Sequence, residues 1–116
     1  MKKTQDILTN TDPAIVSETA LKVLHQIALA WGLSEREELE LLGESGNSDS
    51  GLSDECLERI SCIFGVYKSL RIFFPTEQQA NSWIKKPNRE FDGRTALSVL
   101  IDDPLTVRRY LDGQLA

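Results

Sequence analysis

The side chains best suited to bind another molecule lie near the end of the sequence, where Arg108 and Arg109 are followed by Asp112 and Gln114. Each arginine carries a planar fork of N–H donors that fits carboxylates and other polar groups. A terminal helix with these groups suits a cleft on another protein. A solvated amphipathic helix is an equally good interpretation of the pattern by itself.

Catalysis has almost no support in the sequence. There is no set of nucleophile, base and orienting residue, and no glycine-rich phosphate loop. Gly43 and Gly46 lie in an expected loop, but the Lys-Ser or Lys-Thr of a phosphate site does not follow them. His25, the one histidine, lies within an expected helix and is interpreted as a half-buried or surface side chain. We expect a protein that is not an enzyme and uses no cofactor.

Two cysteines, Cys56 and Cys62, are present. On one helix their spacing places them about 240° apart and roughly 9 Å along the axis. They cannot bridge each other there, because a disulfide needs Cα atoms closer than about 7 Å. With one histidine there is also no metal-ligand spacing. We expect two unbridged thiols and no metal site.

Charge is distributed unevenly along the chain, whose net charge is −5. Residues 1–58 carry four basic and twelve acidic side chains, and residues 59–116 carry nine basic and six acidic ones. An acidic half is a poor nucleic-acid binder, because phosphate neutralisation supplies most non-specific affinity. The basic half suits an acidic protein partner, although mixed surface charge for solubility is equally ordinary.

The length of 116 residues indicates one domain that buries a core without disulfides or metals. No apolar run approaches the roughly 18–20 residues that span a bilayer. Lys2 and Lys3 are not followed by the long apolar segment of a signal peptide. We therefore expect a cytoplasmic protein that does not enter a membrane.

Proline, glycine and capping residues predict six short helices with apolar residues at helical spacing. Gly65 is expected to break or bend the third helix, and Phe64 and Tyr67 are expected in its buried face. No alternation with a period of two lasts long enough for a strand. The fold class is therefore all-α, a compact bundle of about six short helices. The expected helices span about residues 13–31, 34–42, 53–74, 76–84, 95–101 and 104–115.

Residues 83–97 contain a helix break followed by a restart. Trp83 anchors the end of one helix, and Pro87 stops it, because proline lacks an N–H and disfavours a helical residue before it. Gly93 permits a backbone angle that a side chain would penalise. The residues expected to shape this loop are Pro87, Phe91 and Gly93.

This break and restart resembles the toxin-binding domain of the MbcA/ParS/Xre antitoxin family. The family signature reads W-x-x-x-P-N, a short loop and G-x-[ST]-[AP]-L, and residues 83–97 follow it. Further segments look like family motifs in the family order. Residues 52–61 are similar to L-S-x-D-T-L-E-R-I-S, with the acid one place early and Cys56 in place of threonine; residues 65–70 are similar to G-I-Y-K-A-L, and residues 107–112 match V-R-R-Y-L-D.

Residues 28–43 look like the first two helices of an Xre-type helix-turn-helix. Such a motif needs a turn of about 3–4 residues and then a recognition helix. Residues 44–51 contain no arginine, lysine or aromatic residue, so we infer that the recognition helix is deleted. The expected divisions are a frayed N-terminus at 1–11, a helix-turn-helix-like half without a recognition helix at 12–64, and a toxin-binding domain at 65–116.

The resemblance implies an antitoxin of a type II toxin–antitoxin system. The implied partner is a RES-domain toxin, an NAD-consuming or ADP-ribosylating enzyme, whose NAD-binding active site the C-terminal helical region would block. A homodimer is also implied. The alternative function is a DNA-binding autorepressor of its own operon, although the missing recognition helix and the acidic half predict weak DNA binding. A third interpretation is an adaptor or dimerisation domain without a toxin.

The resemblance places toxin contacts in the signature segment and in the C-terminal helix. For Asn88 a loop-shaping role is the stronger interpretation and a direct contact the weaker one. No residue is assigned to DNA. The expected toxin-binding residues are Trp83, Asn88, Arg94, Arg108, Arg109, Asp112, Gln114, Leu115 and Ala116.

Overall fold

The computed structural model describes residues 13–43, 47–48 and 51–115. Within these ranges it contains six α-helices, so the predicted all-α bundle is confirmed; two-residue strands form one small antiparallel pair. The expectations for residues 1–11 and Ala116 lie outside the described residues. The elements are α2 (Pro13–Trp31), α3 (Glu35–Leu42), β1 (Asn47–Ser48), β2 (Gly51–Leu52), α4 (Asp54–Phe73), α5 (Glu77–Trp83), the 3₁₀ turn η1 (Arg89–Phe91), α6 (Ala96–Asp102) and α7 (Pro104–Leu115).

Side-chain caps start four of these helices where the sequence predicts them. Ser34 and Glu37 form a reciprocal capping box at α3, with the Ser34 Oγ accepting from the Glu37 N–H at 3.1 Å. Ser53, Thr76 and Thr95 each accept one backbone N–H in the first turn of α4, α5 and α6. These N–H groups have no partner within their helix, so each cap removes an unsatisfied donor.

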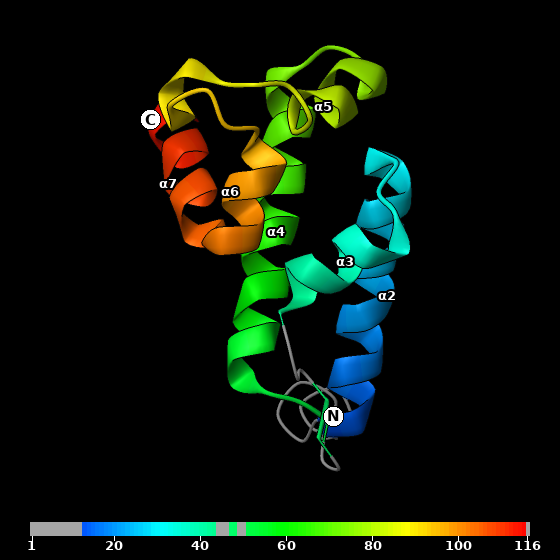
Figure 1. Cartoon of the computed structure of the whole chain (residues 1–116). Coiled ribbons are helices and arrows are strands. Elements are labelled where there is room, and N and C mark those ends of the chain that lie inside the picture. The colour runs from blue at the N-terminus through cyan, green and yellow to red at the C-terminus, as the bar shows by residue number, and fades with distance from the viewer. Residues whose placement is uncertain (1–12, 44–46, 49–50, 116) are drawn as a thin grey trace.

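The helix α4 is the central element of the fold (Figure 1). The helices α2 and α3 lie on one side of it, and α6 and α7 lie on the other. One buried core runs through all of them, since Leu24 and Trp31 of α2 belong to the same apolar cluster as Leu70, Leu100 and Val107. Each such side chain contributes about 1.5–3 kcal/mol by leaving water.

The break expected at Gly65 does not occur, because α4 is continuous from Asp54 to Phe73. A bend at Gly65 stays a prediction. A Cβ at Gly65 would meet the guanidinium of Arg108 on α7. The glycine therefore makes room for a side chain of the neighbouring helix. The helix also runs through the expected division between residues 64 and 65, and that division stays a prediction.

Phe64 differs from its predicted place in the core. Its side chain is 41% exposed, whereas Tyr67, one turn further along, is partly buried. The Lys68 ammonium lies 5.0 Å from the centre of the Phe64 ring, so a cation–π contact covers part of the exposed face. Helical spacing marked Phe64 as apolar but could not show that no element among the described residues covers it.

Other expectations for single residues are confirmed. Cys56 and Cys62 are both unbridged. His25 lies at the surface, where its Nδ1 is 3.1 Å from Oε1 of Glu38 and links α2 to α3. None of the helices in the described part of the chain has the length and apolar character needed to cross a membrane.

Candidate functional site

The loop between α5 and α6 is organised around Asn88. The Asn88 N–H donates to the Arg94 carbonyl at 3.0 Å, and the Asn88 carbonyl accepts from the N–H groups of Phe91 and Gly93 at 3.0 and 2.9 Å. The Asn88 side-chain oxygen accepts from the Glu90 N–H at 2.8 Å. Four hydrogen bonds of Asn88 thus hold the loop closed.

Two consecutive residues of this loop have positive φ, Asp92 at 57° and Gly93 at 84°. Nothing lies within 4 Å of the position that a Cβ would take on Gly93. Glycine is therefore favoured at this position by its backbone angle and not by lack of space. Pro87 and Thr95 pair across the base of the loop through an isolated bridge.

Aromatic rings connect the loop to α5 and α7. The ring of Phe91 stands edge-on to Trp83, with centroids 6.4 Å apart, and edge-on to Tyr110, with centroids 5.4 Å apart. Phe91 itself is buried. Edge-to-face pairs add about 0.5–1.5 kcal/mol to the burial of the rings. The loop is therefore fixed against α7.

A small apolar pocket opens beside these rings, with a volume of about 210 Å³. It brings together two predicted site residues that are far apart in the sequence, Trp83 at the end of α5 and Gln114 near the end of α7. We call it the aromatic pocket. Its walls are Leu70, Phe73, Phe74, Trp83, Tyr110, Leu111 and Gln114.

The two neighbouring arginines of α7 have different surroundings. Arg108 lies over Gly65 of α4, with its Nη1 3.5 Å from the Ser61 carbonyl and its Nε 3.6 Å from Oδ2 of Asp112. Arg109 is exposed. Successive side chains on a helix point about 100° apart, so the pair cannot act as one double fork.

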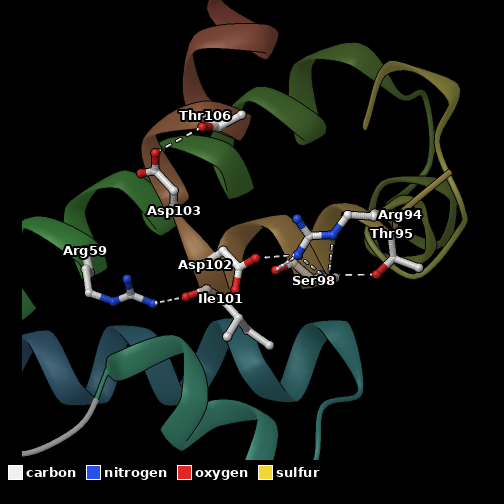
Figure 2. A network of polar contacts seen from close by, with 8 residues as sticks. All are labelled: Arg59, Arg94, Thr95, Ser98, Ile101, Asp102, Asp103 and Thr106. Atoms are coloured by element: carbon white, nitrogen blue, oxygen red, sulfur yellow. Dashed lines mark hydrogen bonds and ion pairs between the residues drawn. The ribbon is translucent and has the colours of Figure 1, made fainter. Parts of the chain in front are cut away.

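Arg94 precedes α6 and is bonded to residues of that helix (Figure 2). Its Nη2 donates to Oδ2 of Asp102 at 2.6 Å and to Oγ of Ser98 at 2.7 Å, and also reaches the Ser98 carbonyl at 3.2 Å. The structure does not bring Arg94 into the lining of the aromatic pocket. Leu115 is the last residue of α7, and Ala116 lies outside the described residues.

Sequence reasoning missed several residues of this site. Tyr110, Phe73 and Phe74 line the aromatic pocket but were not predicted as site residues. Tyr110 stands within the V-R-R-Y-L-D motif, so the resemblance contained a signal for it. For Phe73 and Phe74 the local pattern indicates only the end of a helix, because α7 completes the pocket from 36 or more residues further along.

Residues 69–114 match the antitoxin Xre/MbcA/ParS C-terminal toxin-binding domain. This part of the chain belongs to that antitoxin domain family. The matched range holds the end of α4, α5, the loop, α6 and nearly all of α7, and therefore the whole lining of the aromatic pocket. The domain is a toxin-binding one, which implies a toxin as the partner of this antitoxin.

A similar protein occurs in Sinorhizobium fredii. This chain is 37% identical over 106 residues to the uncharacterized protein y4oB of that organism. The aligned region covers 81% of this chain and 82% of the relative. No solved structure matches the chain. The helices α2 and α3 lie outside the matched domain, so their helix-turn-helix interpretation stays a prediction.

Proposed function

We propose that this antitoxin neutralises a RES-domain toxin by laying its C-terminal helical region over the toxin's NAD-binding active site. The RES partner and the blocking of the NAD site rest on the sequence resemblance. The observation that carries the proposal is the aromatic pocket, because residues of the signature segment and of the terminal helix form it jointly within the matched toxin-binding domain.

The pocket supplies the chemistry of an interface anchor. Most binding energy at protein interfaces comes from a few buried aromatic or arginine side chains surrounded by polar groups. Trp83 and Tyr110 are partly buried and form the apolar walls, and Gln114 adds an exposed amide. An apolar side chain of the toxin would fill the hollow, and Gln114 would pair with a polar group beside it.

Charged residues around the pocket would orient the toxin. Arg109 is exposed and makes no ion pair with any residue that the structure describes, so we propose it as the main contact to an acidic rim. Arg94, Arg108 and Asp112 already have partners in this chain, and we propose toxin contacts through their solvent-facing sides. We also propose Leu115 and Ala116 as toxin contacts.

A second copy of the chain is the other partner that we propose. A groove of about 650 Å³ lies between α2 and α4. Its apolar lining includes two side chains that face solvent in the single chain, Leu29 at 59% and Phe64 at 41% exposure. Large apolar side chains gathered along an open groove are typical of an interaction surface.

The charges of the groove favour a two-fold pairing. The helices α2 and α4 run in the same direction, since Ser17 bonds Leu52 just before α4, and Trp31 packs against Tyr67 late in α4. Lys22 lies midway along α2, whereas Glu77 follows the end of α4. A two-fold axis across the groove would place the helices of the second copy antiparallel to those of the first. Each Lys22 would then lie near Glu77 of the second copy.

Co-purification tests the proposed function. The chain and a RES-domain toxin encoded beside its gene are purified separately, mixed and passed through a sizing column. A stable complex supports the antitoxin, and the absence of one from active, folded components contradicts it. Retardation of DNA from its own promoter region at low salt would favour the autorepressor instead.

A further inference from the structure

Arg59 of α4 connects two helix ends that are distant in the sequence. Its Nε donates to the Leu41 carbonyl at 2.9 Å, in the last turn of α3, and its Nη2 donates to the Ile101 carbonyl at 2.9 Å, in the last turn of α6. A weaker bond of 3.4 Å reaches the Glu40 carbonyl. Figure 2 shows the bond from Arg59 to Ile101 beside the Arg94 contacts.

These bonds satisfy groups that helices cannot satisfy themselves. The last carbonyls of a helix have no N–H partner within it, and they lie at the negative end of the helix dipole. A guanidinium near a helix C-terminus therefore gains both hydrogen bonds and charge complementarity. Arg59 does this for two helices at once through two different nitrogens of its planar fork, whereas a lysine would offer one compact ammonium in their place.

Arg59 lies outside the range of the toxin-binding domain, which begins at residue 69. No carboxylate pairs with it among residues 13–43, 47–48 and 51–115. Its described polar contacts are all with carbonyl groups. Its role is therefore to hold helix ends together, and not to form a surface ion pair.

The position of α6 determines where α7 begins. One residue, Asp103, separates the two helices, and its carboxylate accepts from the Leu105 N–H at 3.2 Å and from the Thr106 hydroxyl at 3.1 Å. Ile101, which Arg59 holds, lies two residues before this corner. A shift at Ile101 would therefore move the start of α7, and with it Tyr110 and Gln114 of the aromatic pocket.

A second cation joins the same parts of the chain. The Lys85 Nζ, in the loop after α5, donates to the Gly32 carbonyl at the end of α2, at 2.8 Å. The C-terminal ends of α2 and α3 are thus both bonded by cations that come from α4 or from the matched domain. The buried core is also shared, because Ile84 and Leu97 belong to the same cluster as Leu24 and Leu41.

We propose that Arg59 is a positioning residue for toxin binding, and that the toxin-binding unit comprises residues 13–115 and not the matched segment 69–114 alone. In this arrangement α2 and α3 support the position of α6 and α7. Arg59 ties them to the corner between α6 and α7, and so sets the helix that forms one wall of the pocket. The inference rests on the proposed toxin binding for its functional part.

The test compares Arg59→Met with Arg71→Met and Arg59→Lys. Arg71 lies on the same helix, bonds the Tyr67 hydroxyl and Glu77 at the surface, and its replacement removes the same charge. We expect Arg59→Met to weaken affinity for the RES-domain toxin at least tenfold, Arg71→Met to change it less than threefold, and Arg59→Lys to fall between them.

A stability control separates positioning from general destabilisation. Ile63→Val creates a small defect in the buried core of α4, at a side chain that lines neither the aromatic pocket nor the groove between α2 and α4. If a core variant of this kind with the same melting temperature as Arg59→Met weakens toxin binding equally, the positioning role is overturned. Equal toxin affinity of Arg59→Met and the native chain overturns it as well.

Amide hydrogen exchange on the free chain tests, without the toxin, whether Arg59 couples α3 to α6 and α7. Arg59→Met should accelerate exchange in the last turn of α3 and at the start of α7 together, and Arg71→Met in neither. Unchanged exchange at α7 overturns the inference. If the native chain does not bind the toxin at all, the proposed function fails, and the exchange result still decides whether Arg59 couples the two helices.

Discussion

Phe91 and Tyr110 pack edge to face with their ring centroids 5.4 Å apart, which joins the loop after α5 to the terminal helix α7. The loop carries the family signature and the helix carries the arginines. One aromatic contact therefore connects the two segments that the proposed function needs to act together. The contact also makes Tyr110 part of both the fold and the aromatic pocket.

Replacing Tyr110 with leucine should have a small effect on folding and a larger one on binding. The edge-to-face contact is worth about 0.5–1.5 kcal/mol, and leucine retains much of the apolar volume. We expect the free energy of unfolding, measured with urea, to fall by about that amount. Toxin affinity should fall about tenfold, because truncating an interface anchor typically costs more than about 1 kcal/mol.

The matched control for Tyr110 is Leu105→Ala. Leu105 is an exposed apolar residue on the same helix and does not line the aromatic pocket. It should leave toxin affinity unchanged. Equal loss of affinity in both variants would contradict the assignment of the pocket as the anchor.

Gly65→Ala should leave the free chain at least as stable, although its Cβ would meet the Arg108 guanidinium. Alanine gains about 0.5–1 kcal/mol over glycine inside a helix. Against this stand the contacts of Arg108 to Ser61 and Asp112, which are long and partly exposed and worth less than about 1 kcal/mol. We expect the melting temperature to stay constant or rise.

Combining this change with Arg108→Ala tests the explanation. Without the guanidinium, Gly65→Ala should give its full stabilisation, so the double variant should be more stable than Arg108→Ala alone. A loss of stability from Gly65→Ala in both backgrounds would show that α7 itself, and not the arginine, occupies the space.

Two glycines near the site should respond to alanine in opposite directions. Gly93 has φ of +84°, so Gly93→Ala should cost about 1–2 kcal/mol although nothing lies near its Cβ. Gly113 lies within α7 with equally free space, so Gly113→Ala should gain about 0.5–1 kcal/mol. Thermal unfolding of both variants is the measurement, and a shift in the same direction would contradict the backbone argument.

A charge exchange tests the proposed homodimer. Lys22→Glu and Glu77→Lys should each weaken dimerisation, because each places like charges together across the two-fold groove. The double variant should restore it. Sedimentation velocity over a range of concentrations is the measurement, and Leu39→Glu, at an exposed leucine of α3 outside the groove, is the control. A monomer at every concentration, or a dimer indifferent to both changes, contradicts the pairing.

The local signals of the sequence predicted the helices well. Ser34, Thr76 and Thr95 mark helix starts because a cap depends on residues three positions away, which a sequence shows directly. The carbonyl groups that Arg59 and Arg108 bond could not be predicted in this way. They lie on helices 18 to 47 residues away, and only the packing of α3, α6 and α7 against α4 brings them together.

The site residues also divide into those that local sequence predicts and those that only distant packing brings together. The loop around Asn88 is set by residues within six positions, so its shape follows from proline, asparagine and glycine in order. The aromatic pocket needs α4, α5 and α7 together. Its two predicted members, Trp83 and Gln114, came from the family resemblance, and nothing in their local sequence indicates that they share a surface.

Covering of the toxin's active site by the end of α7 is the core of the proposed function. It is tested most directly by co-expressing the RES-domain toxin with the full chain, with Arg109→Glu, and with a chain that ends at Asp112, while cellular NAD is followed. Ending at Asp112 keeps the buried Val107 and Leu111, so the fold should survive. We expect the full chain to restore growth and NAD, and both variants to fail while remaining folded. Full rescue by both variants would contradict blocking by the C-terminal end.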